Sequence, residues 1–151
     1  MPRCPGVVYR SNLFSGTEGN YTFETTGPME RCDFDRDGFS GGPWEYFFNW
    51  SEVRYPTIEE VCQRAPVYGR AVRADPETCF ASGLRAPAQA EEQFALHSND
   101  LRLAASSGAL DRGEGLANIN DGYSGTAPDL GAFELGAELP PYGPRPEGGA
   151  P

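Results

Sequence analysis

The stretch Asn118–Glu134, "NINDGYSGTAPDLGAFE", decides how the fold of this chain is interpreted. It contains three carboxylate residues, three glycines and one proline, and it lacks the periodicity of a helix. Glycine, proline and aspartate favour turns, so the stretch is predicted to be a loop. Three roles suit such a loop: a metal site, an active site, or the structural end of a fold.

The composition of the whole chain limits these choices. Its 151 residues suit a single domain, and its 19 glycines and 14 prolines predict frequent turns and irregular loops. Nine Phe, seven Tyr and two Trp supply large rings for a core. The formal net charge of −10 argues against nucleic-acid binding, which needs clustered cations. No apolar run approaches the roughly 18 residues of a membrane span.

Short strands separated by polar loops are predicted along most of the chain. Runs rich in β-branched and aromatic residues predict strands over residues 6–14, 20–26, 44–50, 67–73 and 100–104. Thr57 followed by Glu60 is a capping box, which predicts a short helix over residues 58–65 that Pro66 ends. Because strands do not alternate with long helices, a doubly wound sheet is not expected.

Four motifs follow one another in the last fifty residues. They are "NDLRL" at Asn99–Leu103, "SSGALDRG" at Ser106–Gly113, the opening stretch, and "LPPYGPR" at Leu139–Arg145. Their order and spacing resemble the C-terminal end of secreted right-handed parallel β-helix proteins of the pectate-lyase-like superfamily, many of which act on carbohydrates. Gly108 and Arg112 depart from that pattern, which usually has proline and a small residue there. The segments before Asn99 resemble the preceding coils more loosely.

The resemblance implies an all-β fold, a right-handed parallel β-helix of few irregular coils with one short helix and a loop-rich C-terminal cap. Residues 6–105 would form the coils with inserted loops and the helix near residues 58–65. Residues 106–145 would form the cap, and residues 146–151 a disordered tail. It also implies an extracellular or periplasmic location, although the first residues show no signal-peptide core.

A cap must cover the apolar end of a stack of coils and satisfy its backbone groups. In the opening stretch, Leu130 and Phe133 are expected to fill the interior. Asp129 is expected to accept hydrogen bonds from nearby backbone N–H groups, and Pro128 prevents further strand pairing. We therefore interpret the stretch as a cap whose carboxylates are structural.

The opposite end of such a stack is expected to be open. Coils bury their apolar faces only against their neighbours. Val7, Val8, Leu13 and Phe14 would lie at an uncovered apolar edge. We expect this edge to meet further N-terminal coils of a longer protein, or a second copy of the chain.

Asp33, Asp35 and Asp37 occupy alternate positions in "DFDRDG", as at the start of an EF-hand or dockerin-type calcium loop. Such a loop requires a glutamate at its twelfth position, where this chain has Trp44, so an EF-hand is not expected. A calcium site of another kind, made by these three carboxylates, stays open beside the alternative of a solvated acidic turn. Calcium is the one cofactor that the sequence suggests.

An aromatic run offers a candidate carbohydrate-binding surface. The rings of Trp44, Tyr46, Trp50 and Tyr55 would stack on sugar rings if they were exposed. Strand alternation places Trp44, Tyr46 and Trp50 on one face together with Phe48, which favours core packing instead.

The four cysteines, Cys4, Cys32, Cys62 and Cys79, lack the CxxC spacing of a zinc site. Their even number permits two disulfides with three possible pairings, and buried free thiols are the alternative. The single histidine, His97, has no recognisable catalytic partner, and we interpret it as structural.

Three functions stay open at this level. The first is a non-catalytic terminal segment of a secreted β-helix protein, associated with carbohydrate and binding a polysaccharide or glycan. The second is a small polysaccharide lyase or glycoside hydrolase, and the third is a structural module that stacks end to end. No residue matches a catalytic motif, so no catalytic residue is assigned.

Overall fold

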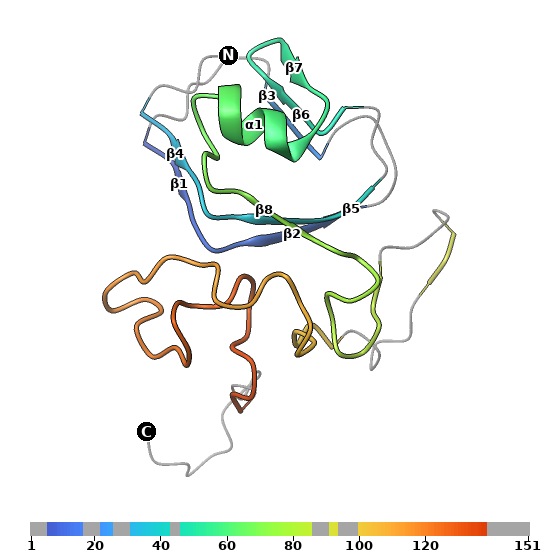
Figure 1. Cartoon of the computed structure of the whole chain (residues 1–151), viewed down its shortest axis with the longest axis vertical. Helices are drawn as coiled ribbons and strands as arrows, with labels where there is room; N and C mark the ends of the chain where they lie inside the picture. The colour runs from blue at the N-terminus through green and yellow to red at the C-terminus, as the bar shows by residue number, and fades with distance from the viewer. Residues whose placement is uncertain are drawn as a thin grey trace, which may run out of the picture.

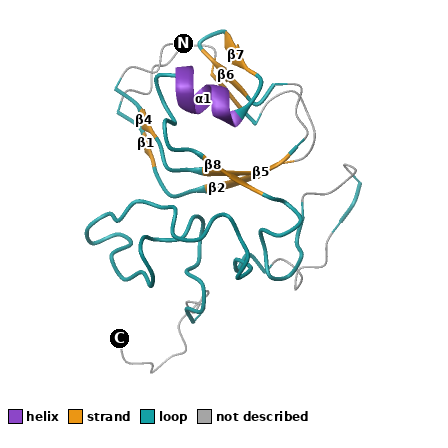
Figure 2. Cartoon of the chain, viewed as in Figure 1, coloured by secondary structure: helices purple, strands orange, loops and turns teal. Residues whose placement is uncertain are grey.

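The computed structural model describes residues 6–16, 22–25, 31–42, 46–85, 91–93 and 100–138. This part of the chain is mostly β, with one short helix, α1 (Ile58–Arg64) (Figures 1 and 2). The strands are β1 (Val8–Tyr9), β2 (Leu13–Gly16), β3 (Phe23–Thr25), β4 (Asp33–Phe34), β5 (Gly38–Gly41), β6 (Phe48–Trp50), β7 (Val53–Tyr55) and β8 (Val72–Ala74). The tail predicted to be disordered, residues 146–151, lies outside the described residues.

The strands pair into three small sheets. β1 pairs with β4, β2 with β5 and then β8, and β3 with β6, all in parallel, while β6 and β7 form an antiparallel hairpin. Paired residues are 25 positions apart in the first three parallel pairs, and 34 positions apart between β5 and β8. The β6–β7 hairpin and α1 occupy the longer connection. The pairings of the described strands do not by themselves define a closed or solenoid arrangement.

The predicted strand over residues 6–14 is divided in two. Ser11 adopts a positive φ of 59°, and Arg36 does the same with a φ of 52° at the equivalent position 25 residues later. Each residue makes a corner, between β1 and β2 and between β4 and β5 respectively. The chain therefore turns from one sheet to the next where the sequence pattern predicted one continuous strand.

Aromatic rings from paired strands stack on one another in the main core. Phe14 stacks on Phe39 with ring centroids 5.3 Å apart, and Phe23 stacks on Phe48 at 5.2 Å. The cause is the parallel register, which pairs these residues directly and sets their side chains on the same face. The buried members of this core are Phe34, Phe39, Phe47, Phe48, Trp50, Tyr55, Ile58, Val61 and Tyr68.

The predicted helix is confirmed as α1. The Thr57 hydroxyl accepts a hydrogen bond from the Glu60 backbone N–H at 3.3 Å, as the capping box predicts. Ile58 and Val61 are buried and anchor the helix to the aromatic core. The helix ends at Arg64, one residue before the predicted end, because Ala65 is already extended ahead of Pro66.

The C-terminal segment (residues 100–138) covers a sheet face. It lies on the opposite side of the β2–β5–β8 sheet from α1 (Figure 1). A second core forms there: Leu13 and Val72 pack with Ala74, Cys79, Leu103, Ala109 and Leu130. We predicted that this segment would close the end of a stack. That role stays a prediction. Packing on the outer face of the sheet is favourable because Leu13 and Val72 would otherwise be exposed to water.

The predicted strand over residues 100–104 is absent from the described structure. Only an isolated antiparallel bridge between Phe80 and Leu103 is present there. The Asp100 carboxylate accepts hydrogen bonds from the backbone N–H and the guanidinium of Arg102, which fold the segment back on itself. Local side-chain bonds of this kind compete with strand pairing.

Candidate functional site

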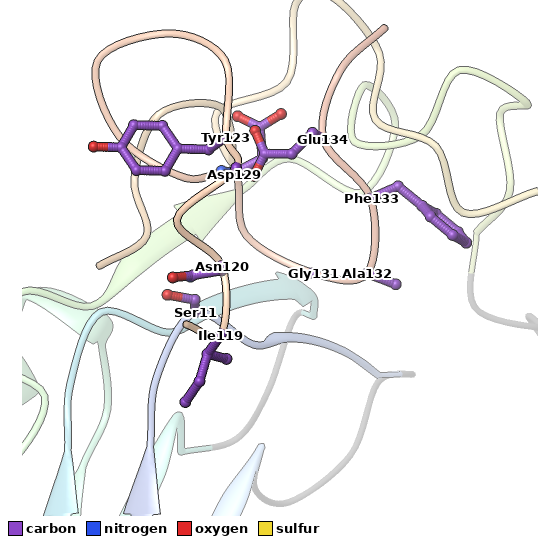
Figure 3. A pocket seen from close by; sticks show the side chains of 10 residues that line it. Ser11, Ile119, Asn120, Tyr123, Asp129, Gly131, Ala132, Phe133 and Glu134 are labelled. Atoms are coloured by element: carbon purple, nitrogen blue, oxygen red, sulfur yellow. Dashed lines mark hydrogen bonds between the residues drawn. The ribbon is translucent and has the colours of Figure 1, made fainter. Parts of the chain in front are cut away.

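A pocket opens within the C-terminal segment. Its volume is about 290 Å³, and most of its wall comes from the stretch that opened the sequence analysis (Figure 3). Ser11, at the corner between β1 and β2, completes the wall from the sheet side. The lining residues are Ser11, Ile119, Asn120, Gly122, Tyr123, Asp129, Gly131, Ala132, Phe133 and Glu134.

Asp129 organises the loop behind the pocket. One carboxylate oxygen accepts the backbone N–H of Asp111 at 2.8 Å, and the other accepts that of Leu135 at 2.7 Å. Its own N–H donates to Glu134 Oε1 at 2.9 Å. Asp129 is only 7% exposed, and these two bonds occupy both of its carboxylate oxygens. The predicted role of Asp129 as a backbone acceptor is confirmed.

Asp111 closes the loop on the other side. Its Oδ1 accepts the backbone N–H groups of Thr126 at 2.7 Å and Ala127 at 3.2 Å, and these bonds lower the pKa of Asp111. A Cβ at Gly125 would lie 2.3 Å from this same oxygen, and Gly125 has a φ of 110°. Glycine is therefore required there for both steric and conformational reasons.

Three contacts join the pocket wall to the residues at and beside the first strands. The backbone carbonyl of Ser11 accepts the Gly131 N–H at 2.9 Å, and its hydroxyl accepts the Glu114 N–H at 2.9 Å. The Arg10 guanidinium donates to Glu114 Oε2 at 2.9 Å and also pairs with Asp33. The pocket wall is thus held by residues about one hundred positions apart in the sequence.

The lining combines a carboxylate with apolar side chains, supplied by Glu134, Tyr123 and Ile119. Glu134 Oε2 is buried and has no hydrogen-bond partner among the described residues. Tyr123 is 38% exposed and Ile119 is 78% exposed, so a ring and an aliphatic side chain of the lining reach solvent; in Figure 3 Ile119 lies beside Ser11 and away from Tyr123. In Figure 3 the Glu134 and Asp129 side chains lie next to each other, with Tyr123 beside them. The site therefore combines an acceptor of hydrogen bonds with apolar surface.

Leu130 and Phe133 differ from each other in burial. Leu130 is fully buried, as predicted, and it packs against the sheet face. Phe133 is only half-buried and lines the pocket instead of filling the core. Pro128 is buried, and its carbonyl accepts the Gly113 N–H at 2.7 Å.

The three aspartates proposed for calcium turn to different partners. Asp33 is exposed and pairs with Arg10, and Asp35 accepts the Arg70 backbone N–H and guanidinium at 2.7 and 2.6 Å. Asp37 is fully buried. Within the ranges that the structure describes, no three acidic, histidine or cysteine side chains are grouped to hold a metal ion. The corner at Arg36 separates the carboxylates because it rotates Asp37 into the protein.

Asp37 is the most buried carboxylate of the three. Its Oδ1 accepts the Asn12 backbone N–H at 2.8 Å and the Asn12 side-chain amide at 3.0 Å. Burial raises the pKa of Asp37, while these bonds act in the opposite direction. Burial, together with the nearby Asp37 charge, also raises the pKa of Tyr68. The two groups interact electrostatically, but their geometry is not that of a conventional hydrogen bond.

Two of the four aromatic residues proposed for carbohydrate binding are core residues. Trp50 is 8% exposed and Tyr55 is 5% exposed, and Trp50 stacks on Phe48 at 5.9 Å. Their burial leaves these two rings little surface for a sugar. Tyr46 is half-buried, and the Arg54 guanidinium lies 5.0 Å from the centre of its ring. Trp44 lies outside the described residues.

Three of the four cysteines are described, and Cys62 and Cys79 are free thiols. Cys32 and Cys62 are half-buried, while Cys79 is fully buried and its pKa is raised by that burial. Cys4 and His97 lie outside the described residues. No described helix is long and apolar enough to cross a membrane.

The sequence did not reveal the pocket. Glu134, Tyr123 and Asn120 stand in the opening stretch, yet no periodicity or motif distinguishes them as a site. The loop closes only when backbone N–H groups far apart in the sequence reach Asp111 and Asp129. The one available signal was the combination of an aromatic residue and two acidic residues within a glycine-rich loop.

Comparisons with known proteins supply no relative for this site. No protein-family model matches the chain, and no match was found among curated proteins or among solved structures.

Proposed function

We propose that this chain is the non-catalytic C-terminal segment of a secreted right-handed parallel β-helix protein that associates with carbohydrate. The observation that carries the proposal is the constant 25-residue separation between paired residues in three successive parallel strand pairs. In a parallel β-helix, each strand of one coil pairs in parallel with the strand a fixed number of residues later in the next coil. The three pairs have this relation in three different sheets. The third passage, through β8, follows after an insertion.

The aromatic stacks support the same architecture. Side chains in equivalent positions of consecutive coils lie directly above one another when the strands are parallel and in register. Phe14 on Phe39 and Phe23 on Phe48 have this arrangement, with interplanar angles of 21° and 19°. Polar pairs follow the same spacing, since Asn49 donates to Glu24 at 2.8 Å.

The exposure of the rings suggests what lies beside the first coil. Tyr9, Phe14 and Phe23 are half-buried, whereas Phe39 is 1% exposed and Phe48 is 0% exposed. The difference arises because β5 and β6 each lie between two strands of their sheet, whereas β1, β2 and β3 each stand at an edge. An edge of this kind favours pairing with a further strand. We propose that a preceding coil or a second copy occupies it.

Hydrogen exchange tests this edge. In a dilute monomer, the outward-facing amides of β1, β2 and β3 should exchange much faster than the amides of the central strands β5 and β6, because the outward N–H groups lack a partner strand. Light scattering over a range of concentrations reports whether a second copy binds, and any association should slow exchange in the same three strands. Strong protection of β1–β3 in a verified monomer would contradict the proposal.

The carboxylates of the C-terminal segment favour a non-catalytic role. General acid–base catalysis by paired carboxylates requires oxygens that can reach the substrate. Both oxygens of Asp129 are bound to backbone N–H groups, and Asp111 holds a turn. These bonds hold the loop conformation, and those to Asp111 also lower its pKa. A lyase or hydrolase built on these residues would have to break the fold of its own site.

The pocket supports the association with carbohydrate. An exposed ring beside hydrogen-bonding oxygens is the usual composition of a small-ligand site. Calorimetric titration with soluble oligosaccharides tests this part of the proposal. Binding without bond cleavage or unsaturated product is the expected result, whereas turnover of any oligosaccharide would support the enzyme alternative.

A further inference from the structure

We infer that the pocket beside Tyr123 binds an uncharged or amino-substituted sugar ring and discriminates against anionic sugars. This inference rests on the proposed carbohydrate association and names its ligand class. It is carried by the charge of the pocket wall, by the unpaired oxygen of Glu134, and by the apolar side chains at the opening.

The charge of the wall opposes an anionic ligand. Asp129 and Glu134 are the two ionisable acids among the lining residues, and no arginine, lysine or histidine is among them. Arg10, which reaches the segment through Glu114, is already paired with Asp33 and Glu114. A uronate would therefore approach two carboxylates without a counter-charge, in a chain whose formal net charge is −10.

The unpaired oxygen of Glu134 favours a ligand that donates hydrogen bonds. Glu134 Oε1 accepts the Asp129 N–H, but Oε2 is buried without a partner among the described residues, which is unfavourable for a carboxylate oxygen. A rotation of the Glu134 side chain toward the pocket would let Oε2 accept a ligand hydroxyl or ammonium group. Bonds to a charged acceptor are stronger than bonds between neutral groups.

Tyr123 and Ile119 supply the other half of the recognition. Both line the pocket and are exposed, and the Tyr123 ring offers a flat apolar face next to Glu134. A sugar ring has a face of C–H groups and an edge of hydroxyl donors, so it can meet the tyrosine and the carboxylate at once. A simple cation would use the carboxylate and leave the apolar surface unmatched.

Gly122 offers a way to block the pocket without disturbing the fold. It lines the pocket, its φ lies outside the left-handed region, and a Cβ placed there would meet no other atom within 4 Å. Gly69 has the same steric freedom in the loop between Tyr68 and Arg70, away from the lining residues. Gly122→Leu and Gly69→Leu are therefore a matched pair, one occluding and one not.

The test is calorimetric titration with three probes at low salt and at about 0.5 M NaCl, where the Debye length is about 4 Å. The probes are a neutral β-linked oligosaccharide, a chitosan oligosaccharide, and an oligogalacturonate of the same length. We expect the neutral and amino probes to bind at least about tenfold more tightly than the acidic one at low salt. High salt should narrow the difference, because it screens the repulsion.

The variants assign the binding to the pocket. Gly122→Leu and Tyr123→Ala should each weaken binding of the neutral probe by at least about tenfold, while Gly69→Leu should not change it. Glu134→Gln should reduce the preference for the amino probe and improve binding of the acidic one. Thermal unfolding of each variant verifies that the fold is kept.

The remaining outcomes of the titrations contradict either the ligand class or the carbohydrate association. Tighter binding of oligogalacturonate, or binding that Gly122→Leu leaves unchanged, would refute the inference and leave the carbohydrate association standing. Free arginine is titrated as a fourth compound, a simple organic cation. If arginine binds and none of the three oligosaccharides does, the pocket is a cation site and the inference is refuted. If none of the four compounds binds, the carbohydrate part of the proposed function fails as well. The coil architecture is tested separately by hydrogen exchange.

Discussion

A double-mutant cycle between Gly38 and Leu130 tests how the C-terminal segment is held on the sheet. Gly38 lies in β5, and a Cβ added there would lie 2.8 Å from Leu130 Cδ1 and 3.0 Å from Leu13 Cδ1. Favourable carbon–carbon contacts are about 3.5–4.0 Å, so the alanine methyl would displace both leucines. Overpacking of this kind costs about 1–3 kcal/mol, and Gly38→Ala should therefore destabilise the protein.

Leu130→Ala removes the opposite partner. Leu130 is fully buried, and truncating a buried leucine costs about 2–5 kcal/mol. In the double variant the alanine at position 38 no longer meets Leu130. Leu13 Cδ1, which would lie 3.0 Å from the new Cβ, can shift into the space that the truncation leaves. Restriction of the unfolded chain by the alanine adds about 0.4–1 kcal/mol of stability. The double variant should be no less stable than Leu130→Ala alone, which corresponds to a coupling energy of at least about 1 kcal/mol.

Urea denaturation followed by tryptophan fluorescence measures the four free energies of unfolding, with constant m-values as the condition for comparing them. Gly69→Ala is the matched control, because its new methyl group would meet no atom within 4 Å. It should be neutral or slightly stabilising. Additive effects of Gly38→Ala and Leu130→Ala, or a Gly38→Ala variant as stable as the control, would refute the packing of the segment on β5.

Three further predictions concern buried polar groups. Asp129→Asn should lower the free energy of unfolding by about 1–3 kcal/mol, because one acceptor oxygen is replaced by an amide donor that faces a backbone N–H. Hydrogen exchange should show loss of amide protection in the C-terminal segment, and unchanged protection would contradict the prediction. Burial raises the folded-state pKa of Asp37, so its contribution to stability is fully present below its unfolded pKa and is lost as pH rises through its folded pKa. Asp37→Asn should therefore raise the midpoint of thermal unfolding at neutral pH and give no gain in acid, where Asp37 is protonated; an equal gain at both pH values would contradict this. Arg10→Gln should cost about 1–2 kcal/mol, less at high salt, because it removes the ion pairs with Asp33 and Glu114. Stability curves at two salt concentrations test this dependence, and a salt-independent loss would argue against an ionic cause.

Local features of the sequence predicted local structure well. The capping box at Thr57 predicted α1 to within one residue, because a helix start is fixed by side chains only a few positions apart. The alternation in the aromatic run favoured core packing, and Trp50 and Tyr55 are buried. The role of Asp129 as a backbone acceptor was also foreseen, because aspartate in a turn has few alternatives.

Long-range features were predicted less well. The strand predicted over residues 6–14 breaks at Ser11, where the chain changes sheet, and the aspartates proposed for calcium separate at the equivalent corner, Arg36. Neither residue carries a sequence signal for a corner, since both are non-glycine residues at positive φ. The backbone adopts this conformation because the strands on each side pair with neighbours 25 residues away.

The sequence by itself determined that the chain is a mostly β, loop-rich, strongly acidic protein with one short capped helix and a turn-forming C-terminal segment. Composition and nearest-neighbour patterns carry that information directly. The tertiary structure alone decided that this segment covers the face of the β2–β5–β8 sheet, and that Ser11 joins Tyr123 and Glu134 around one pocket. Those placements depend on contacts between residues about one hundred positions apart. The contacts stabilise the protein only after the sheet has formed, so patterns of neighbouring residues do not predict them.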